Sequence, residues 1–97
     1  YFYIIELVDE NNKETAPVGV VRLDNSAQGQ YTISIFIDAD YFGKGIGKYA
    51  LQQIDNLHPD VIINATVLKE NAASQALFSS AGYQRVNSEQ FTRPVVE

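Results

Sequence analysis

The hydrophobic period of the chain changes at its middle, on either side of a glycine-rich turn, and this change limits the folds open to it. Before the turn every second residue shares one face: Tyr31, Ile33, Ile35 and Ile37. After the turn apolar residues recur at helical spacing: Ile46, Ala50, Ile54 and Leu57. The first period is that of a strand and the second that of an amphipathic helix. The pattern predicts a strand followed closely by a helix that packs on a sheet.

Two further strands are expected before this unit. Residues 1–8 and 17–23 are rich in β-branched and aromatic residues, and a polar turn over residues 9–15 separates them as in a hairpin. A second turn is expected over residues 24–29, which are polar or small. Three strands in succession, joined by short turns, predict an antiparallel arrangement for this part of the chain.

Strand character returns after the helix. Residues 61–68 carry β-branched side chains on both faces, as expected of a strand inside a sheet, and Pro59 comes where the helix should already have ended. The strand-helix-strand unit over residues 31–68 predicts a right-handed parallel crossover.

A second helix and two short strands are expected to close the chain. Asn71 can cap the helix, and Gly82 can end it in a left-handed turn. Three apolar residues at helical spacing predict its buried face: Ala73, Leu77 and Ala81. The strands are expected at residues 83–86 and 91–96, and Pro94 predicts an edge position for the second of them.

These elements predict an α/β (α+β) fold with a mixed, mostly antiparallel sheet and two helices. At 97 residues the chain is expected to be a single domain, residues 1–97. The net charge is −5 and the seven Lys and Arg residues are scattered, which disfavours nucleic acid as a partner. No apolar run approaches the roughly 20 residues that cross a bilayer, and no charged-then-apolar leader opens the chain. A soluble, cytoplasmic protein without a membrane partner is expected.

The available residue types restrict the chemistry. The chain has no Cys, which excludes disulfides, thiolate zinc sites and Cys nucleophiles. His58 is the only histidine, so no metal site is expected. Its place at a helix end predicts a surface residue that interacts with the helix dipole. Any reaction must use carboxylates, Tyr, Ser, Lys, the backbone or a bound cofactor.

The glycine-rich turn from Tyr41 to Lys48 suits a phosphate group. Alternate glycines at 43, 45 and 47 let the backbone approach a ligand, and the first amides of the helix point outward at the positive end of its dipole. The spacing matches neither a Walker P-loop nor the G-x-G-x-x-G dinucleotide fingerprint. A pyrophosphate is therefore the expected ligand, and a tight turn without any ligand is the alternative.

Two blocks of sequence resemble the GNAT family of N-acetyltransferases. Residues 33–51 are similar to the family's acetyl-CoA signature, Arg/Gln-x-x-Gly-x-Gly/Ala after a splayed strand. Residues 67–83 are similar to its asparagine-headed helix, which ends in a Gly-aromatic pair. The resemblance implies an acyl-CoA N-acyltransferase fold that lacks the usual N-terminal strand and helices. An excised or truncated C-terminal domain and a minimal family member are both compatible with this.

The resemblance also implies acetyl-CoA as cosubstrate and assigns its contacts. The amides of the turn would bind the pyrophosphate: Phe42, Gly43, Lys44, Gly45, Ile46, Gly47 and Lys48. The end of the preceding strand would hydrogen-bond the pantetheine arm, because its departure from the next strand leaves backbone groups without partners: Ile35, Phe36 and Ile37. The second helix would contribute Asn71, Ser74 and Phe78. Asn71 is alternatively a helix cap, and Ser74 alternatively an exposed helix residue.

The implied reaction is acetyl transfer to a primary amine, and the catalytic residues stay unassigned. A backbone amide near Phe36 or Ile37 would donate to the oxyanion. Phe78 stands where the family often has a Tyr that protonates the thiolate, Phe42 replaces the usual Arg or Gln, and Tyr83 is expected in the core. Four polar residues that could act as bases are interpreted as ordinary sheet residues: Glu6, Arg22, Thr32 and Ser34.

The acceptor is left open between a small molecule, an amino sugar and a protein amine. The alternative function is a non-catalytic module that binds CoA, or a dimerisation module in which exposed sheet edges pair. A homodimer is one of the arrangements that such edges permit.

Overall fold

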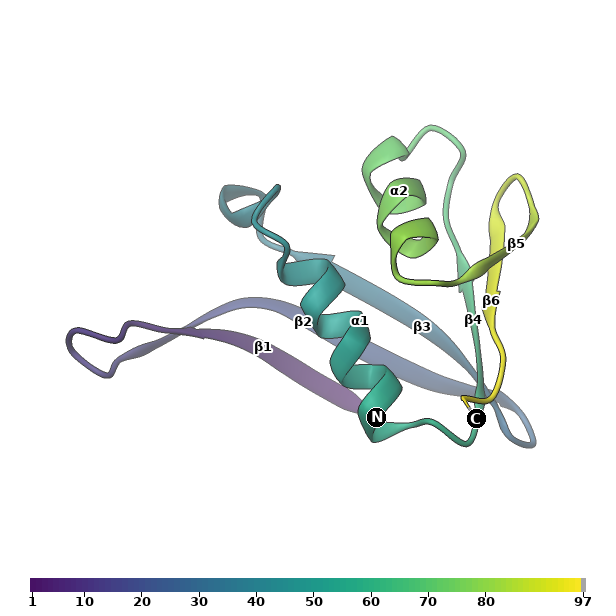
Figure 1. Cartoon of the computed structure of the whole chain (residues 1–97), viewed down its shortest axis with the longest axis horizontal. Helices are drawn as coiled ribbons and strands as arrows, with labels where there is room; N and C mark the ends of the chain where they lie inside the picture. Colours follow the sequence, from purple (N-terminus) through teal and green to yellow (C-terminus); the bar gives the residue numbers. More distant parts are fainter. Residues whose placement is uncertain (97) are drawn as a thin grey trace.

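The computed structural model describes residues 1–96 and contains one six-stranded sheet in the order β1-β2-β3-β4-β6-β5. The elements are β1 Phe2–Val8, β2 Thr15–Ala27, β3 Gln30–Ile37, the 3-10 turn η1 Ala39–Tyr41, α1 Ile46–Leu57, β4 Ile62–Thr66, α2 Ala72–Ser80, β5 Gln84–Asn87 and β6 Gln90–Arg93. Only β3 and β4 pair in parallel, which confirms the mixed sheet and the crossover through α1. Both helices lie on one face of the sheet (Figure 1). Within residues 1–96 no helix is long and apolar enough to cross a membrane.

Two strand predictions are corrected. The turn expected over residues 24–29 shrinks to two residues, because β2 continues to Ala27 through a register shift that the Asn25 side chain supports by donating to the carbonyls of Ala27 and Gln30. The edge position expected for the last strand is wrong, since β6 lies between β4 and β5. Pro94 follows the last residue of β6, so it removes no hydrogen bond from the ladder.

The core lies between the sheet and the helices. Its fully buried large side chains are Phe91, Leu23, Leu51, Ile63, Val18 and Val21. The predicted apolar face of α1 is confirmed at Ile46, Ala50 and Ile54, but Leu57 is 57% exposed, whereas His58 next to it is buried.

The buried face of α2 also differs from the prediction. Gln75 and Phe78 are buried, and the predicted Leu77 and Ala81 are half-buried against the core, but the predicted Ala73 is exposed. The Gln75 side chain can be buried because its amide donates to the carbonyls at positions 67 and 88. The predicted caps of this helix are confirmed: the Asn71 side chain accepts from the amide of residue 74, and residue 82 has φ of 89°.

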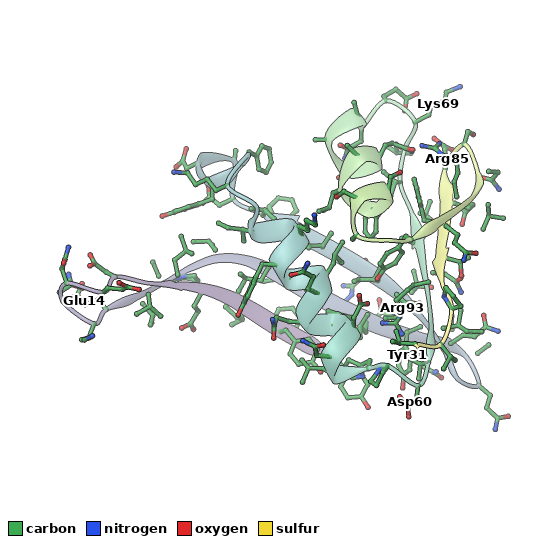
Figure 2. The ribbon with its side chains drawn as sticks, viewed as in Figure 1. Glu14, Tyr31, Asp60, Lys69, Arg85 and Arg93 are labelled. Atoms are coloured by element: carbon green, nitrogen blue, oxygen red, sulfur yellow. The ribbon has the colours of Figure 1, made fainter. Side chains whose placement is uncertain are left out.

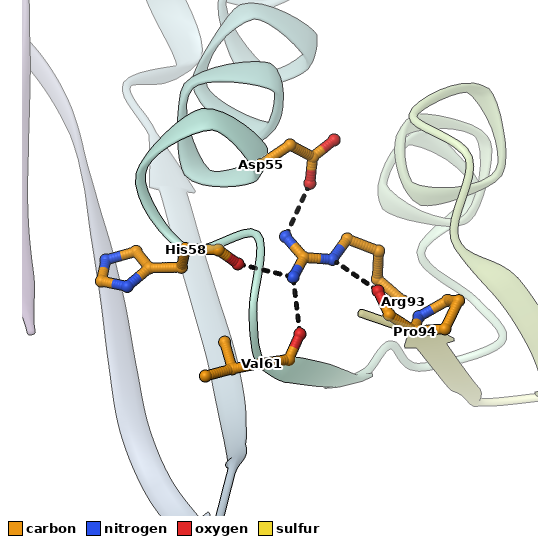
Figure 3. A network of polar contacts seen from close by, with 5 residues as sticks. All are labelled: Asp55, His58, Val61, Arg93 and Pro94. Carbon is orange, nitrogen blue, oxygen red and sulfur yellow. Dashed lines mark hydrogen bonds and ion pairs between the residues drawn. The ribbon is translucent and has the colours of Figure 1, made fainter. Parts of the chain in front are cut away.

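A buried arginine ties the C-terminal strand to the end of α1. Arg93 points inward from β6 (Figure 2), and its guanidinium donates to the Asp55 carboxylate at 2.9 Å and to the carbonyls of His58 and Val61 at 2.7 and 2.6 Å (Figure 3). The side chain is only 5% exposed. This network holds the chain immediately before β4 against the end of the sheet where β3 and β4 still pair.

The surface position predicted for His58 is wrong. The residue is 8% exposed, and its Nε2 lies 2.6 Å from the hydroxyl of Tyr3, while its ring lies 4.4 Å from that of Tyr1. The first strand therefore covers the end of α1. The local sequence pattern does not predict this contact, because the residues involved are far apart in the chain. Burial is the main cause that lowers the pKa of His58 below its ordinary value of 6.5, with Asp60 acting in the opposite direction.

Arg93→Met should lower the free energy of unfolding by about 3 kcal/mol, because it leaves Asp55 and two carbonyls without their donor. Denaturant unfolding measures this loss. The control is Arg22→Met, which removes an ion pair with Asp24 whose side chains are both more than half exposed, and should cost about 0.5 kcal/mol or less. Equal losses in the two variants would contradict the structural role of Arg93.

Stability should fall as the pH drops below 6.5, because His58 binds a proton more readily in the unfolded chain than in the folded one. The stabilisation is complete above pH 6.5 and is lost toward the lower pKa of the folded state. Other groups titrate in the same range, so the measurement is the difference in unfolding free energy between the wild type and His58→Gln at pH 7.5 and 5.5. Relative to His58→Gln, the wild type should lose unfolding free energy between pH 7.5 and pH 5.5. A difference that stays the same, or that grows in favour of the wild type at pH 5.5, would contradict the prediction.

Candidate functional site

The site begins where β3 and β4 separate. Their parallel pairing covers only three residue pairs, from Gln30–Ile62 to Thr32–Asn64, after which the two strands diverge (Figure 1). The amide of residue 38 donates to the carbonyl of residue 18, so in this register the even-numbered residues of β3 bond to β2. The odd-numbered Ile35 and Ile37 therefore direct their N–H and C=O groups into the gap, as predicted.

Phe36 departs from the prediction. It lies opposite Val20 in a hydrogen-bonded pair of the β2–β3 ladder, so its backbone groups point away from the gap. Its amide is consequently not available as the expected oxyanion donor, whereas that of Ile37 is. The Phe36 side chain is 72% exposed on the face of the sheet opposite the helices.

The glycine-rich turn presents a row of free amides at the start of α1. Gly45 is the N-cap with φ of 77°, and the first helical hydrogen bond runs from the amide of Tyr49 to its carbonyl. No side chain caps the helix. Within the described part of the chain, the backbone N–H groups of residues 43–48 have no protein acceptor. These amides stand at the positive end of the α1 dipole.

Helix α2 closes the other side of the site. A Cβ atom on Gly47 would lie 3.0 Å from the nearer methyl carbon of Leu77, so the two helices approach closely only because residue 47 has no side chain. Asn71 uses its carbonyl oxygen as the cap of α2, accepting from Ser74 at 3.1 Å, and this leaves its side-chain N–H group available to a ligand.

These elements enclose a cleft of about 480 Å³. It is lined by Ile35, Phe36, Ile37, Tyr41, Phe42, Gly43, Gly45, Ile46, Gly47, Lys48, Asn71, Ala73, Ser74 and Leu77. The structure thus brings together every predicted cofactor residue except Lys44 and Phe78. Sequence reasoning missed Tyr41, Ala73 and Leu77; the two α2 residues were interpreted as core because apolar helical spacing does not distinguish a cleft wall from a core.

Phe78 lies deeper than predicted. It is 3% exposed and packs edge-on against Tyr83, with ring centroids 5.0 Å apart. It borders a second hollow of about 250 Å³ in the gap, lined by Ile33, Ser34, Ile35, Thr66, Val67, Leu68, Asn71, Ser74 and Phe78. Tyr83 is in the core as predicted, and burial raises the pKa of its hydroxyl far above the usual range. It borders neither hollow, so it is no ready proton donor for them.

The four polar residues weighed as bases occupy different surroundings. Arg22 is held by Asp24 at 2.9 Å on the surface, and Ser34 alone borders a hollow, the second one. In residues 1–96 the His, Asp and Glu side chains form no group of three or more that could hold a metal ion.

Sequence comparison agrees with this geometry. A family model described as acetyltransferase (GNAT) domain matches residues 2–85. An N-alpha-acetyltransferase, RimI, from Mycobacterium tuberculosis is 32% identical over 69 residues, which cover 70% of this chain and 44% of the relative. The chain therefore spans less than half the length of that protein.

Solved structures share the fold. A domain from Methanocaldococcus jannaschii superposes with a TM-score of 0.75 at 24% identity, over 95% of this chain and 64% of that one. A phosphinothricin acetyltransferase from Sinorhizobium meliloti in complex with AcCoA gives a TM-score of 0.76 at 18% identity, over 99% of this chain and 61% of that one. Both likenesses concern the fold alone.

Gly47→Val should lower the free energy of unfolding by about 1–3 kcal/mol through overlap with Leu77. Leu77→Ala in the same chain should recover part of the loss, and a double-mutant cycle in denaturant measures that coupling. Lys48→Val is the control, because it places the same side chain at an exposed position of the same turn, and helix propensity alone would make it the more costly of the two substitutions. Absence of coupling between residues 47 and 77 would contradict the close helix contact.

Proposed function

We propose, because this chain belongs to the acetyltransferase (GNAT) domain family, that it binds acetyl-CoA in the cleft and transfers the acetyl group to a primary amine. The observation that carries the proposal is the row of amides at residues 43–48 without protein acceptors, at the edge of a cleft of about 480 Å³. A row of free N–H groups at a helix N-terminus is suited to a pyrophosphate, since it combines hydrogen-bond donors with a favourable dipole.

The glycines make this row accessible. Gly43 and Gly45 adopt φ of 76° and 77°, and a Cβ atom on either would meet no protein atom within 4 Å. The space beside them is therefore open, and glycine is favoured there by the backbone conformation. Lys48 borders the same cleft and adds a positive charge for the phosphates.

The diverging strand supports the remainder of the cofactor. Ile35 and Ile37 offer N–H and C=O groups at the gap, which suits the two amides of a pantetheine arm as an added strand would. Acetyl-CoA supplies an acetyl group activated as a thioester, which the amine takes up as free CoA is released. The amide of Ile37 keeps the proposed role of oxyanion donor, because it faces the gap.

The lack of a side-chain proton donor beside the cleft favours a second candidate function. Phe78 has no proton to give and Tyr83 is sealed in the core, so in the catalytic proposal the leaving thiolate takes its proton from solvent. The same observation supports a module that binds CoA without catalysis. Release of free thiol with a panel of amines distinguishes the two, since the binding module gives none.

The acceptor and the cellular setting are also proposals. The name of the RimI relative, an N-alpha-acetyltransferase, makes a protein α-amine one acceptor to test beside small amines. A cytoplasmic location and a homodimer remain predictions from the sequence.

Gly45→Asp should weaken acetyl-CoA binding about tenfold or more, because it places a carboxylate in the open space beside the free amides. Isothermal titration calorimetry measures the dissociation constant.

The matched control is Gly29→Asp. Gly29 also has a positive φ, 71°, and open surroundings, but it lies in the β2–β3 turn and lines neither the cleft nor the second hollow. The two variants share the backbone strain and the added charge. Affinity lost equally in both, or retained in Gly45→Asp, would overturn the assignment of the pyrophosphate to this turn.

A further inference from the structure

The end of β4 is held by contacts on the edge that faces away from β3. Pairing with β3 stops at Asn64, whereas pairing with β6 continues to Thr66. The Val67 amide then donates to the Glu89 carbonyl at 2.8 Å, which extends the β4–β6 register by one more pair. The end of β4 therefore stays with β6 after it has left β3 (Figure 1).

The side chain of Gln75 completes this extra pair. In an antiparallel ladder the Val67 carbonyl would accept from the amide of Glu89, but that amide donates to the Asn87 side chain at 3.0 Å. The Gln75 side-chain amide takes its place and donates to the Val67 carbonyl at 3.0 Å. It also donates to the carbonyl of Ser88 at 3.0 Å. Gln75 thus ties α2 both to the end of β4 and to the turn between β5 and β6.

Burial alone does not account for a glutamine at this position. Gln75 is 9% exposed, and within residues 1–96 its side-chain oxygen has no hydrogen-bond partner. A buried oxygen without a partner costs free energy, and an apolar side chain of the same length avoids that cost. The bonds that its amide donates therefore distinguish Gln75 from an apolar residue.

The elements that Gln75 joins form the walls of the gap. The second hollow has the end of β4 on one side, at Val67, and α2 on another, at Asn71. Ile35 of β3 borders both this hollow and the cleft. If β4 kept the register of its paired part, the carbonyl of Thr66 would accept from the Ile35 amide and the gap would close. The position of the end of β4 thus decides whether the Ile35 amide is free.

We propose that Gln75 is a positioning residue, which holds the end of β4 on β6 and α2 and so keeps the gap open for the pantetheine arm. Gln75 lines neither the cleft nor the second hollow, so it acts through Val67 and α2. The ligand in this proposal rests on the proposed function, whereas the open gap is a property of the free protein.

Gln75→Met tests the opening without any ligand. Methionine is of similar length and has no donor, so the end of β4 can move toward β3 and Thr66 can accept from the Ile35 amide. Solvent exchange of that amide, measured by NMR, should slow about fivefold or more. Leu23→Ala is the control, because Leu23 is a core residue of β2, 1% exposed, and lines neither space. A change that only destabilises the fold leaves this exchange equally fast or makes it faster.

Gln75→Met should also weaken the binding of acetyl-CoA about fivefold or more, because the Ile35 backbone no longer faces an open gap. ADP is the second probe, since it carries a pyrophosphate but no pantetheine arm. Its dissociation constant should stay within about twofold of the wild-type value, since the amides of the glycine-rich turn are unchanged. Calorimetry measures both ligands. Gln52→Met, at an exposed position of α1, is the matched substitution and should leave both constants unchanged.

The outcomes separate this proposal from the proposed function. Unchanged or faster exchange of the Ile35 amide in Gln75→Met would overturn the positioning role. Equal weakening for acetyl-CoA and ADP, or no weakening of either, would also overturn it. Gln75→Leu, which likewise lacks a donor, should behave as Gln75→Met does. A wild-type protein that binds neither ligand would refute the proposed function, and the exchange of the Ile35 amide would still decide whether Gln75 holds the gap open.

Discussion

The separation of β3 from β4 is the constraint on which the rest of the molecule depends. Parallel pairing stops after Thr32 and Asn64, and from that point one edge of β3 has no strand beside it. Backbone groups in such a place need partners from solvent or from a ligand. At the other end of the gap Arg93 binds the carbonyl of Val61, next to the start of β4, so the strands are held together where they pair and open only toward the glycine-rich turn.

Two sets of backbone groups then lie along one path. The amides of residues 43–48 are free because α1 starts without a side-chain cap, and those of Ile35 and Ile37 are free because β4 has diverged. The contact between Gly47 and Leu77 sets α2 as the far wall of the same path. None of these features needs a reactive side chain, so the proposed binding of a long phosphorylated cosubstrate rests on backbone groups alone.

The sequence predicted the elements well where local pattern decides them, as in the period change around the turn and the caps at Asn71 and Gly82. It failed where distant contacts decide. His58 is buried because β1 passes over it, and β6 is an inner strand because β5 folds back beside it. The orientation of the Phe36 backbone depends on the register between β3 and β2, and the sequence of one strand does not determine that register. Lining residues of the cleft were found through motif resemblance, whereas Leu77, predicted to pack in the core, packs against the core and also lines the cleft.

The proposed function requires an acidic chain to bind an anion. Twelve Asp and Glu residues face seven Lys and Arg, so the molecule as a whole repels phosphates. Attraction must therefore be local, and backbone amides at a helix end provide it without changing the net charge.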